Sequence, residues 1–160
     1  MKKEFYYGLL LVLSFTLMSS TCSSDDDVSS IDNSQQINQI ENTVESGTWR
    51  VSNFNDSGQD ETSDFVGYDF TFNSNGSLVA SNGTNTMSGT WSITDDSNSN
   101  DDSNDDDDID FNIFFPVPDS SDFEDLNDDW EIVSTSSTKI ELIDISGGNG
   151  GTDLLTFEKN

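Results

Sequence analysis

Apolar and polar residues alternate in eight short runs between Gly47 and the end of the chain. A period of two with one polar face is typical of antiparallel strands whose sheet has one side in water. The pairs Asn75-Gly76 and Asn82-Gly83 stand before two of the runs and indicate hairpin turns. The apolar positions of the eight runs are Trp49 and Val51; Tyr68, Phe70 and Phe72; Leu78 and Ala80; Met87, Gly89, Trp91 and Ile93; Ile109, Phe111, Ile113 and Phe115; Trp130 and Ile132; Ile140 and Leu142; Leu155 and Phe157.

A short helix is predicted just before the first strand, over residues 34–46. Ser34 is placed to cap its start and Gly47 to end it. Apolar residues three and four positions apart give the helix one narrow apolar stripe, which suits a helix lying on a surface. The members of this stripe are Ile37, Ile40 and Val44.

Eight strands that each have one apolar face favour a closed barrel, because closure removes the exposed strand edges. The predicted fold is therefore all-β: an eight-stranded antiparallel barrel over residues 47–160, with the short helix in front of it. Large rings occupy the predicted inward face, so we expect side chains to fill the barrel. These rings are Trp49, Phe70, Phe72, Trp91, Phe111, Phe115, Trp130 and Phe157, and the three tryptophans mark the core and the closed end.

An apolar stretch, residues 114–118, leaves the fifth of these strands. An exposed apolar patch of this kind often marks an interaction site, which makes Phe114, Phe115 and Phe123 candidate ligand contacts at the barrel mouth. The alternative is that Phe123 and Leu126 cap the mouth as part of the core.

The first 21 residues have the order of a secretory signal peptide. Lys2 and Lys3 precede an apolar run at residues 9–18, and small residues follow. The run is much shorter than the roughly 20 residues that a membrane-spanning helix needs. We therefore expect residues 1–21 to be removed and residues 22–33 to form a flexible acidic tether.

Charge and composition exclude several function classes. The chain has 32 acidic against 5 basic residues, a formal net charge of −27, no histidine and one cysteine. Nucleic acid is not an expected partner, because few Lys or Arg side chains are present to contact phosphates. Catalytic units and zinc or copper sites that require histidine are excluded, and one cysteine leaves no intramolecular disulfide.

Acidic residues concentrate in a loop predicted at residues 95–108. Asp96, Asn98 and Asn100 imitate the start of a calcium-binding EF-hand loop, but Asp101 stands where that loop needs glycine. We expect no dedicated metal site and no cofactor, although residues 95–110 have the charge density for weak, non-specific binding of divalent cations. A hydrolase that uses two carboxylates is a distant alternative, since chance pairs are inevitable among so many acids.

Two resemblances to known families add to this picture. Cys22, just after the apolar run, resembles the lipobox cysteine of bacterial lipoproteins, which implies fatty-acyl chains such as palmitate on that residue. The following Ser23, Ser24, Asp25, Asp26 and Asp27 resemble the export signal of surface-exposed lipoproteins in Bacteroidota. This implies an outer-membrane lipoprotein that faces the cell exterior.

The barrel region resembles the lipocalin-like domain of Bacteroidota surface lipoproteins. The resemblance rests on three segments, which are Gly47-Thr48-Trp49, the run 68–78 and Gly89-Thr90-Trp91-Ser92-Ile93. It implies a calycin-type barrel in which Trp49 plugs the closed end.

The expected function is a non-catalytic binding or accessory module, monomeric and attached to the membrane through Cys22. Its ligand would be a small apolar or glycan-like molecule or an envelope protein. The alternative is a ligand-free structural protein that forms an acidic surface coat.

Overall fold

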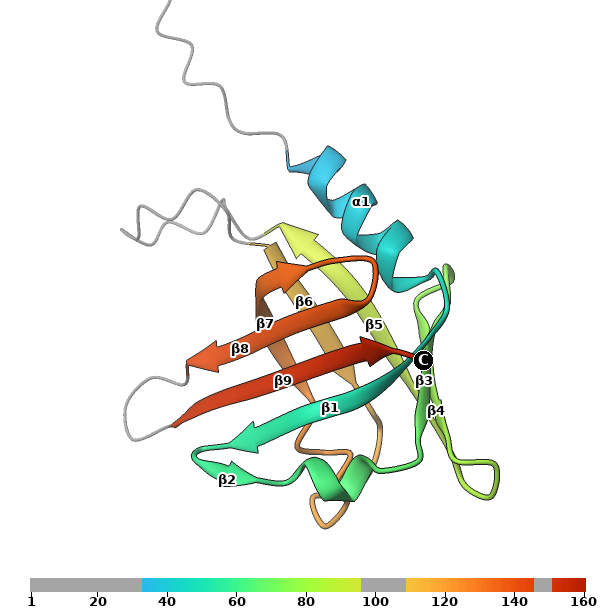
Figure 1. The fold of residues 1–160 in the computed structure, drawn as a ribbon, viewed down its shortest axis with the longest axis vertical. Coiled ribbons are helices and arrows are strands. Elements are labelled where there is room, and N and C mark those ends of the chain that lie inside the picture. The colour runs from blue at the N-terminus through green and yellow to red at the C-terminus, as the bar shows by residue number, and fades with distance from the viewer. Residues whose placement is uncertain (1–32, 96–108, 146–150) are drawn as a thin grey trace, which may run out of the picture. The chain divides into compact units, whose positions relative to one another are not determined.

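The computed structural model describes residues 33–95, 109–145 and 151–160. The predicted signal peptide, the lipid-attachment residue Cys22, the export signal and residues 96–108 of the acidic loop lie outside these ranges. The described elements (Figure 1) are α1 (Ser34–Val44), β1 (Thr48–Asp56), β2 (Gln59–Asp60), the 3-10 turn η1 (Thr62–Phe65), β3 (Asp69–Phe72), β4 (Ser77–Ser81), β5 (Thr86–Asp95), β6 (Ile109–Phe114), β7 (Asp128–Thr135), β8 (Lys139–Ile145) and β9 (Thr152–Lys159).

The strands close into a barrel, as the alternating pattern predicts. Each strand pairs antiparallel with the next in the order β1-β3-β4-β5-β6-β7-β8-β9, and β9 pairs back onto β1. The closing ladder runs from Trp49 opposite Lys159 to Asn55 opposite Leu154. This confirms the all-β, eight-stranded antiparallel barrel. The two-residue strand β2, which pairs with the end of β1, was not predicted because it is too short and polar to show a period.

The predicted helix is present, but its ends differ from the prediction. Asn33, not Ser34, is the N-cap residue, and its side chain makes no capping hydrogen bond. The helix ends at Val44, three residues before Gly47, because the following turn begins with Ser46 N–H donating to the Thr43 carbonyl.

In both Gly-Thr-Trp segments, neighbouring atoms lie so close to the glycine that a side chain would collide with them. A Cβ on Gly47 would lie 2.8 Å from Cε of Lys159, and one on Gly89 would lie 2.3 Å from the carbonyl oxygen of Phe114. The second contact is with backbone, which cannot move aside. Gly89 therefore lets the end of β6 pack directly against β5.

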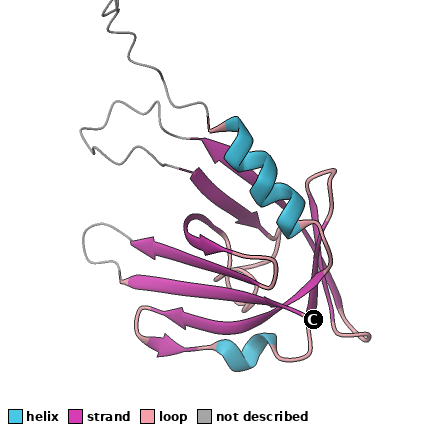
Figure 2. Cartoon of the chain, turned by 45° about the horizontal axis from the view of Figure 1, so that its top comes forward, coloured by secondary structure: helices cyan, strands magenta, loops and turns pink. Residues whose placement is uncertain are grey.

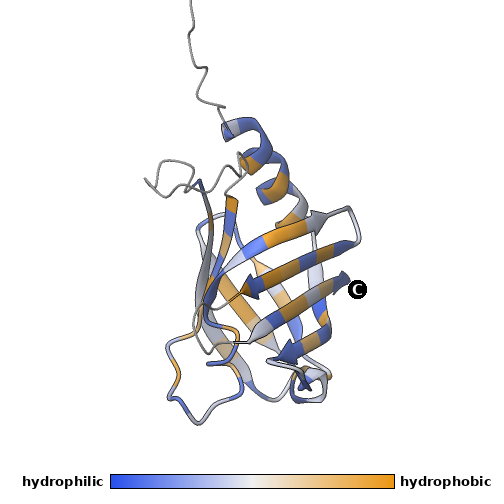
Figure 3. Cartoon of the chain, turned by 90° about the vertical axis from the view of Figure 1, so that its left-hand side faces the viewer, coloured by the Kyte–Doolittle hydropathy of each residue, from blue (hydrophilic) through white to orange (hydrophobic). Residues whose placement is uncertain are grey.

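The barrel interior is filled with rings. All eight predicted inward-facing aromatic side chains are buried. Phe72 lies in the middle and makes edge contacts with Trp91, Phe111 and Phe157, with ring centroids 5.4 to 5.5 Å apart. Figure 3 shows the alternation of apolar and polar residues along the strands that produces this interior.

Both ends of the barrel are covered. At one end lies α1, whose Ile40 and Val44 are buried in the same core as the strand side chains. At the other end lie η1 and residues 115–127, which contribute buried Phe65, Phe123 and Leu126. Figure 2 shows the two helical elements at opposite ends of the strands.

Candidate functional site

The three tryptophans join the barrel wall to the segments that cover it. The indole N–H of Trp49 donates to the carbonyl of Val44 at the end of α1, at 2.8 Å. Trp91 donates to Asn73 in the β3–β4 turn at 3.0 Å, and Trp130 donates to Leu126 at 3.1 Å. Buried indole N–H groups need such partners. The geometry therefore gives all three side chains a structural role.

Phe115 and Phe123 are core residues and do not line an open mouth. Phe115 is fully buried, and Phe123 is 4% exposed. The ring of Phe123 contacts Phe65, Tyr68, Phe70 and Phe115, with the first and last centroids at 5.4 and 5.0 Å. The capping alternative therefore describes this end of the barrel, and the assignment of these two residues as ligand contacts is corrected.

Phe114, unlike Phe115 and Phe123, is exposed. Its side chain is 54% exposed, because the last residue of β6 points to the outside of the wall while Phe115 turns inward. The segment after it is fixed by Asn127, whose side-chain amide accepts from the Phe115 N–H at 2.5 Å and donates to the Phe115 carbonyl at 3.0 Å. This two-sided clamp holds the cap in place.

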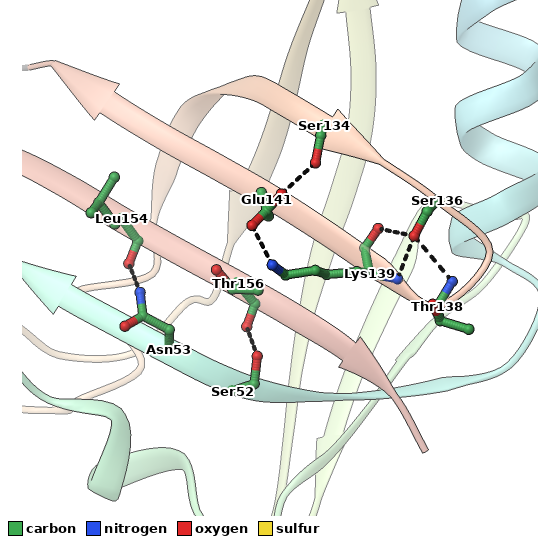
Figure 4. Close-up of polar contacts among 9 residues, drawn as sticks. All are labelled: Ser52, Asn53, Ser134, Ser136, Thr138, Lys139, Glu141, Leu154 and Thr156. Atoms are coloured by element: carbon green, nitrogen blue, oxygen red, sulfur yellow. Dashed lines mark hydrogen bonds and ion pairs between the residues drawn. The ribbon is translucent and has the colours of Figure 1, made fainter.

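One groove of about 620 Å³ lies on the outer face of β1, β7, β8 and β9, and we call it the outer-face groove. Its lining mixes hydroxyl, amide, aliphatic and charged side chains, several of which appear in Figure 4. It lies outside the barrel wall, in contrast to the internal cavity of a ligand-carrying barrel. The lining residues are Ser52, Asn53, Val133, Lys139, Glu141, Leu142, Leu154, Thr156 and Glu158.

Two register irregularities lie on either side of this groove. The β1–β9 ladder shifts between Val51 and Asn53, and the β7–β8 ladder shifts between Ile132 and Ser134. Such bulges bend a strand and re-aim side chains, and they often occur near binding sites. The skipped residue of β7, Val133, is 60% exposed on the outer surface.

One of the three basic side chains of the barrel, Lys139, lines the outer-face groove, and a second, Arg50, reaches the lining residue Glu158. Only Arg50, Lys139 and Lys159 follow Lys3 in the sequence. Arg50 forms an ion pair with Glu158 at 2.5 Å, and Lys139 pairs with Glu141. Hydrogen bonds from Lys139 and then from Ser134 lower the pKa of Glu141. This carboxylate is thus kept ionised, the opposite of what a general acid needs.

A second groove, of about 470 Å³, lies between α1 and the strand wall, and we call it the helix groove. Among the described residues, no ionisable side chain lines it. The described β6–β7 ladder ends at the pair Asp110 and Glu131. Residues 132–135 of β7 extend past that last pair and border the helix groove. The lining residues are Gln36, Gln39, Ile40, Thr43, Ile109, Ile132, Val133, Ser134 and Thr135.

Carboxylates crowd the end of the barrel farthest from α1. Burial, followed by a hydrogen bond with Asp129 and the charge of Asp144, raises the pKa of Asp128 to about 6. Burial and neighbouring carboxylates also raise the pKa of Asp125 and Glu61. None of these three groups lines either groove, so their repulsion bears on stability.

Asp128→Asn is expected to raise the melting temperature above pH 6, with little effect near pH 4. The raised pKa means that folding favours the protonated form, so Asp128 lowers stability as pH rises from its ordinary pKa of 3.8 to about 6. Thermal melts at intervals between about pH 4 and about pH 7.5 measure this. Asp119→Asn removes the same charge at an exposed loop position and serves as the control. An equal gain for both variants at every pH would contradict the assignment.

The described ranges contain no group of three or more His, Cys, Asp or Glu side chains arranged to hold a metal ion. Weak divalent-cation binding by residues 95–110 remains a prediction, because 96–108 lie outside those ranges.

In the described part of the chain, no helix has the length and apolar character needed to cross a membrane.

Comparisons with known proteins give little beyond the fold. No family model matches the chain, and no curated protein matches it. A solved structure with some likeness is the crystal structure of a DUF4847 family protein from Bacteroides vulgatus, at 19% identity and a TM-score of 0.47. The match covers 76% of this chain and 97% of that one. The barrel is therefore established by the strand pairing of this chain itself.

The sequence did not indicate either groove. Their polar residues stand on outward strand positions, where a solvated face has the same pattern. The one available signal was in α1, where Gln36, Gln39 and Thr43 form an uncharged polar stripe in a strongly acidic chain.

Proposed function

We propose that this chain is a lipid-anchored binding or accessory module of a bacterial outer surface, in which the barrel is a solid scaffold and binding takes place on its outside. Two features together carry this proposal. The barrel interior is filled with side chains and covered at both ends, whereas the outer wall carries two grooves. A barrel that carried its ligand inside would need interior space that rings occupy here.

The sequence supports the anchored location. The basic start, the short apolar run and Cys22 resemble a lipoprotein signal, and the acidic residues after Cys22 resemble a surface-export signal. Several acyl chains on one residue would hold the protein firmly, since each buried methylene contributes about 0.8 kcal/mol. The acidic tether would be repelled by anionic headgroups and would keep the barrel away from the membrane.

A ligand-free acidic coat is the second candidate, and the filled interior favours it as well. Mass spectrometry of the native protein from its host separates the two. A binding module retains or captures a specific molecule, whereas a coat protein carries the lipid on Cys22 and nothing else. The grooves show no candidate general acid for the acid-pair hydrolase among the described residues with a resolved shift, because the pKa of Glu141 is lowered.

Cys22→Ser is expected to abolish membrane attachment and to leave either a soluble protein or an unprocessed precursor, because Cys22 is the chain's only thiol. Cell fractionation and intact-mass measurement check this. A companion variant with Asp25, Asp26 and Asp27 all changed to Ala should keep the lipid and lose labelling by an external antibody. Mature, membrane-bound Cys22→Ser protein would refute the anchor, and undiminished labelling of the companion would refute the export signal.

A further inference from the structure

We infer that the helix groove is a binding site for a neutral carbohydrate. The inference rests on the proposed function and names its ligand class. The groove is formed by one face of α1 and by the end of β7, two elements that are both tied to the core.

Charge is the first reason for a neutral ligand. The chain has a formal net charge of −27, yet none of the described residues that line this groove is ionisable. An anionic ligand would be repelled by the surrounding field. A cationic ligand would find stronger partners on the many exposed carboxylates elsewhere. A neutral polar molecule is the class that an uncharged groove can select on an acidic protein.

The polar groups of the lining match sugar hydroxyls. Primary amides and hydroxyls can each donate and accept, as every sugar hydroxyl can. Among the described residues, the side-chain amides of Gln36 and Gln39 have no hydrogen-bond partner, and both side chains are exposed. The hydroxyl of Thr43 donates to the Gln39 carbonyl at 2.9 Å, and that of Ser134 donates to Glu141 at 2.6 Å. Both hydroxyl oxygens can therefore still accept.

Aliphatic side chains also line the helix groove. Ile40, Ile109, Ile132 and Val133 present C–H groups toward the groove, which suit the apolar face of a sugar ring. The groove volume of about 470 Å³ falls within the roughly 300–1,000 Å³ of small-molecule sites.

An extended peptide that adds a strand to β7 is the competing occupant. Strand addition needs a regular edge whose N–H and C=O groups alternate in register. The β7 ladder shifts between Ile132 and Ser134, within the segment that borders the groove. Bulges protect strand edges against such pairing, so the geometry favours the carbohydrate.

The test titrates the full lipidated chain, in a detergent without a sugar headgroup, with maltohexaose, cellohexaose, xylohexaose and mannohexaose. Hexagalacturonate is the anionic probe. Calorimetry gives the affinity, and NMR of ¹⁵N-labelled protein follows the side-chain amides of Gln36 and Gln39. We expect at least one neutral probe to bind with a Kd of about 1 mM or below. Gln36→Ala with Gln39→Ala should weaken that binding about tenfold or more.

The matched control is Asn38→Ala with Asn42→Ala, which removes two amides from the same helix outside the groove. It should bind like the natural chain. Binding that Asn53→Ala weakens in place of the glutamine pair would move the site to the outer-face groove and overturn the inference, while the proposed function stands.

Three further outcomes overturn the inference. They are equal binding of hexagalacturonate, equal loss in the asparagine control, and no binding of any probe. If no probe binds but native mass spectrometry finds another retained molecule or a bound protein, the carbohydrate is wrong and the proposed function survives. If neither is found, both are wrong.

Discussion

Trp49→Ala is expected to unfold the barrel or to leave it barely folded in dilute buffer. Trp49 is fully buried and donates its indole N–H to the carbonyl of Val44 at 2.8 Å. Nζ of Lys159 lies 5.3 Å from the ring centroid. Truncation of a buried tryptophan costs about 3–5 kcal/mol, and a small domain has only about 5–15 kcal/mol of stability in total.

Added salt should partly rescue this variant. The net charge of −27 opposes compaction, and physiological salt screens charges beyond about 8 Å. Thermal and urea melts at low and high salt measure both effects. Trp49→Phe is the control, because it keeps most of the ring and loses the hydrogen bond to Val44. It should cost about 1–3 kcal/mol. A melting temperature of Trp49→Ala near that of the natural chain would mean that α1 does not depend on this side chain.

Phe123→Ala is expected to produce the second large loss, again about 3–5 kcal/mol. Phe123 is 4% exposed and its ring contacts Phe65, Tyr68, Phe70 and Phe115, so truncation leaves a cavity among these rings. The variant should also bind the dye ANS more strongly, because the truncation exposes apolar interior at this end. Urea melts and dye fluorescence are the measurements.

Phe114→Ala is the matched control for Phe123→Ala. The two residues lie near the same end of the barrel, but Phe114 is 54% exposed. Its truncation should change stability by no more than about 0.5 kcal/mol, as is usual for surface positions. Equal losses for the two variants would show that residues 115–127 do not cap the barrel.

The strand content and most of the core follow from the sequence alone, although the buried Phe54 and Phe65 were not predicted. A period of two needs only the printed residues, and it places the inward apolar side chains of the strands except at Phe54, which is buried out of phase after the register shift between Val51 and Asn53. All eight predicted inward rings are buried for the same reason, since a one-residue slip would move them all to water. The assignment of Phe115 and Phe123 as ligand contacts failed because alternation gives the side of a strand but not what covers its end.

Tertiary structure decided the closure details and both grooves. The shifts at Val51/Asn53 and Ile132/Ser134 depend on how neighbouring strands pair, which no local pattern encodes. The approach of Gln36 and Gln39 to Ser134 and Thr135 joins segments that are about a hundred positions apart in the chain. The sequence by itself determined most of the strand side chains that avoid water, because the local period of two sets which face of a strand is apolar. Only the fold decided which of the remaining polar side chains face one another, because that depends on register and on the position of α1.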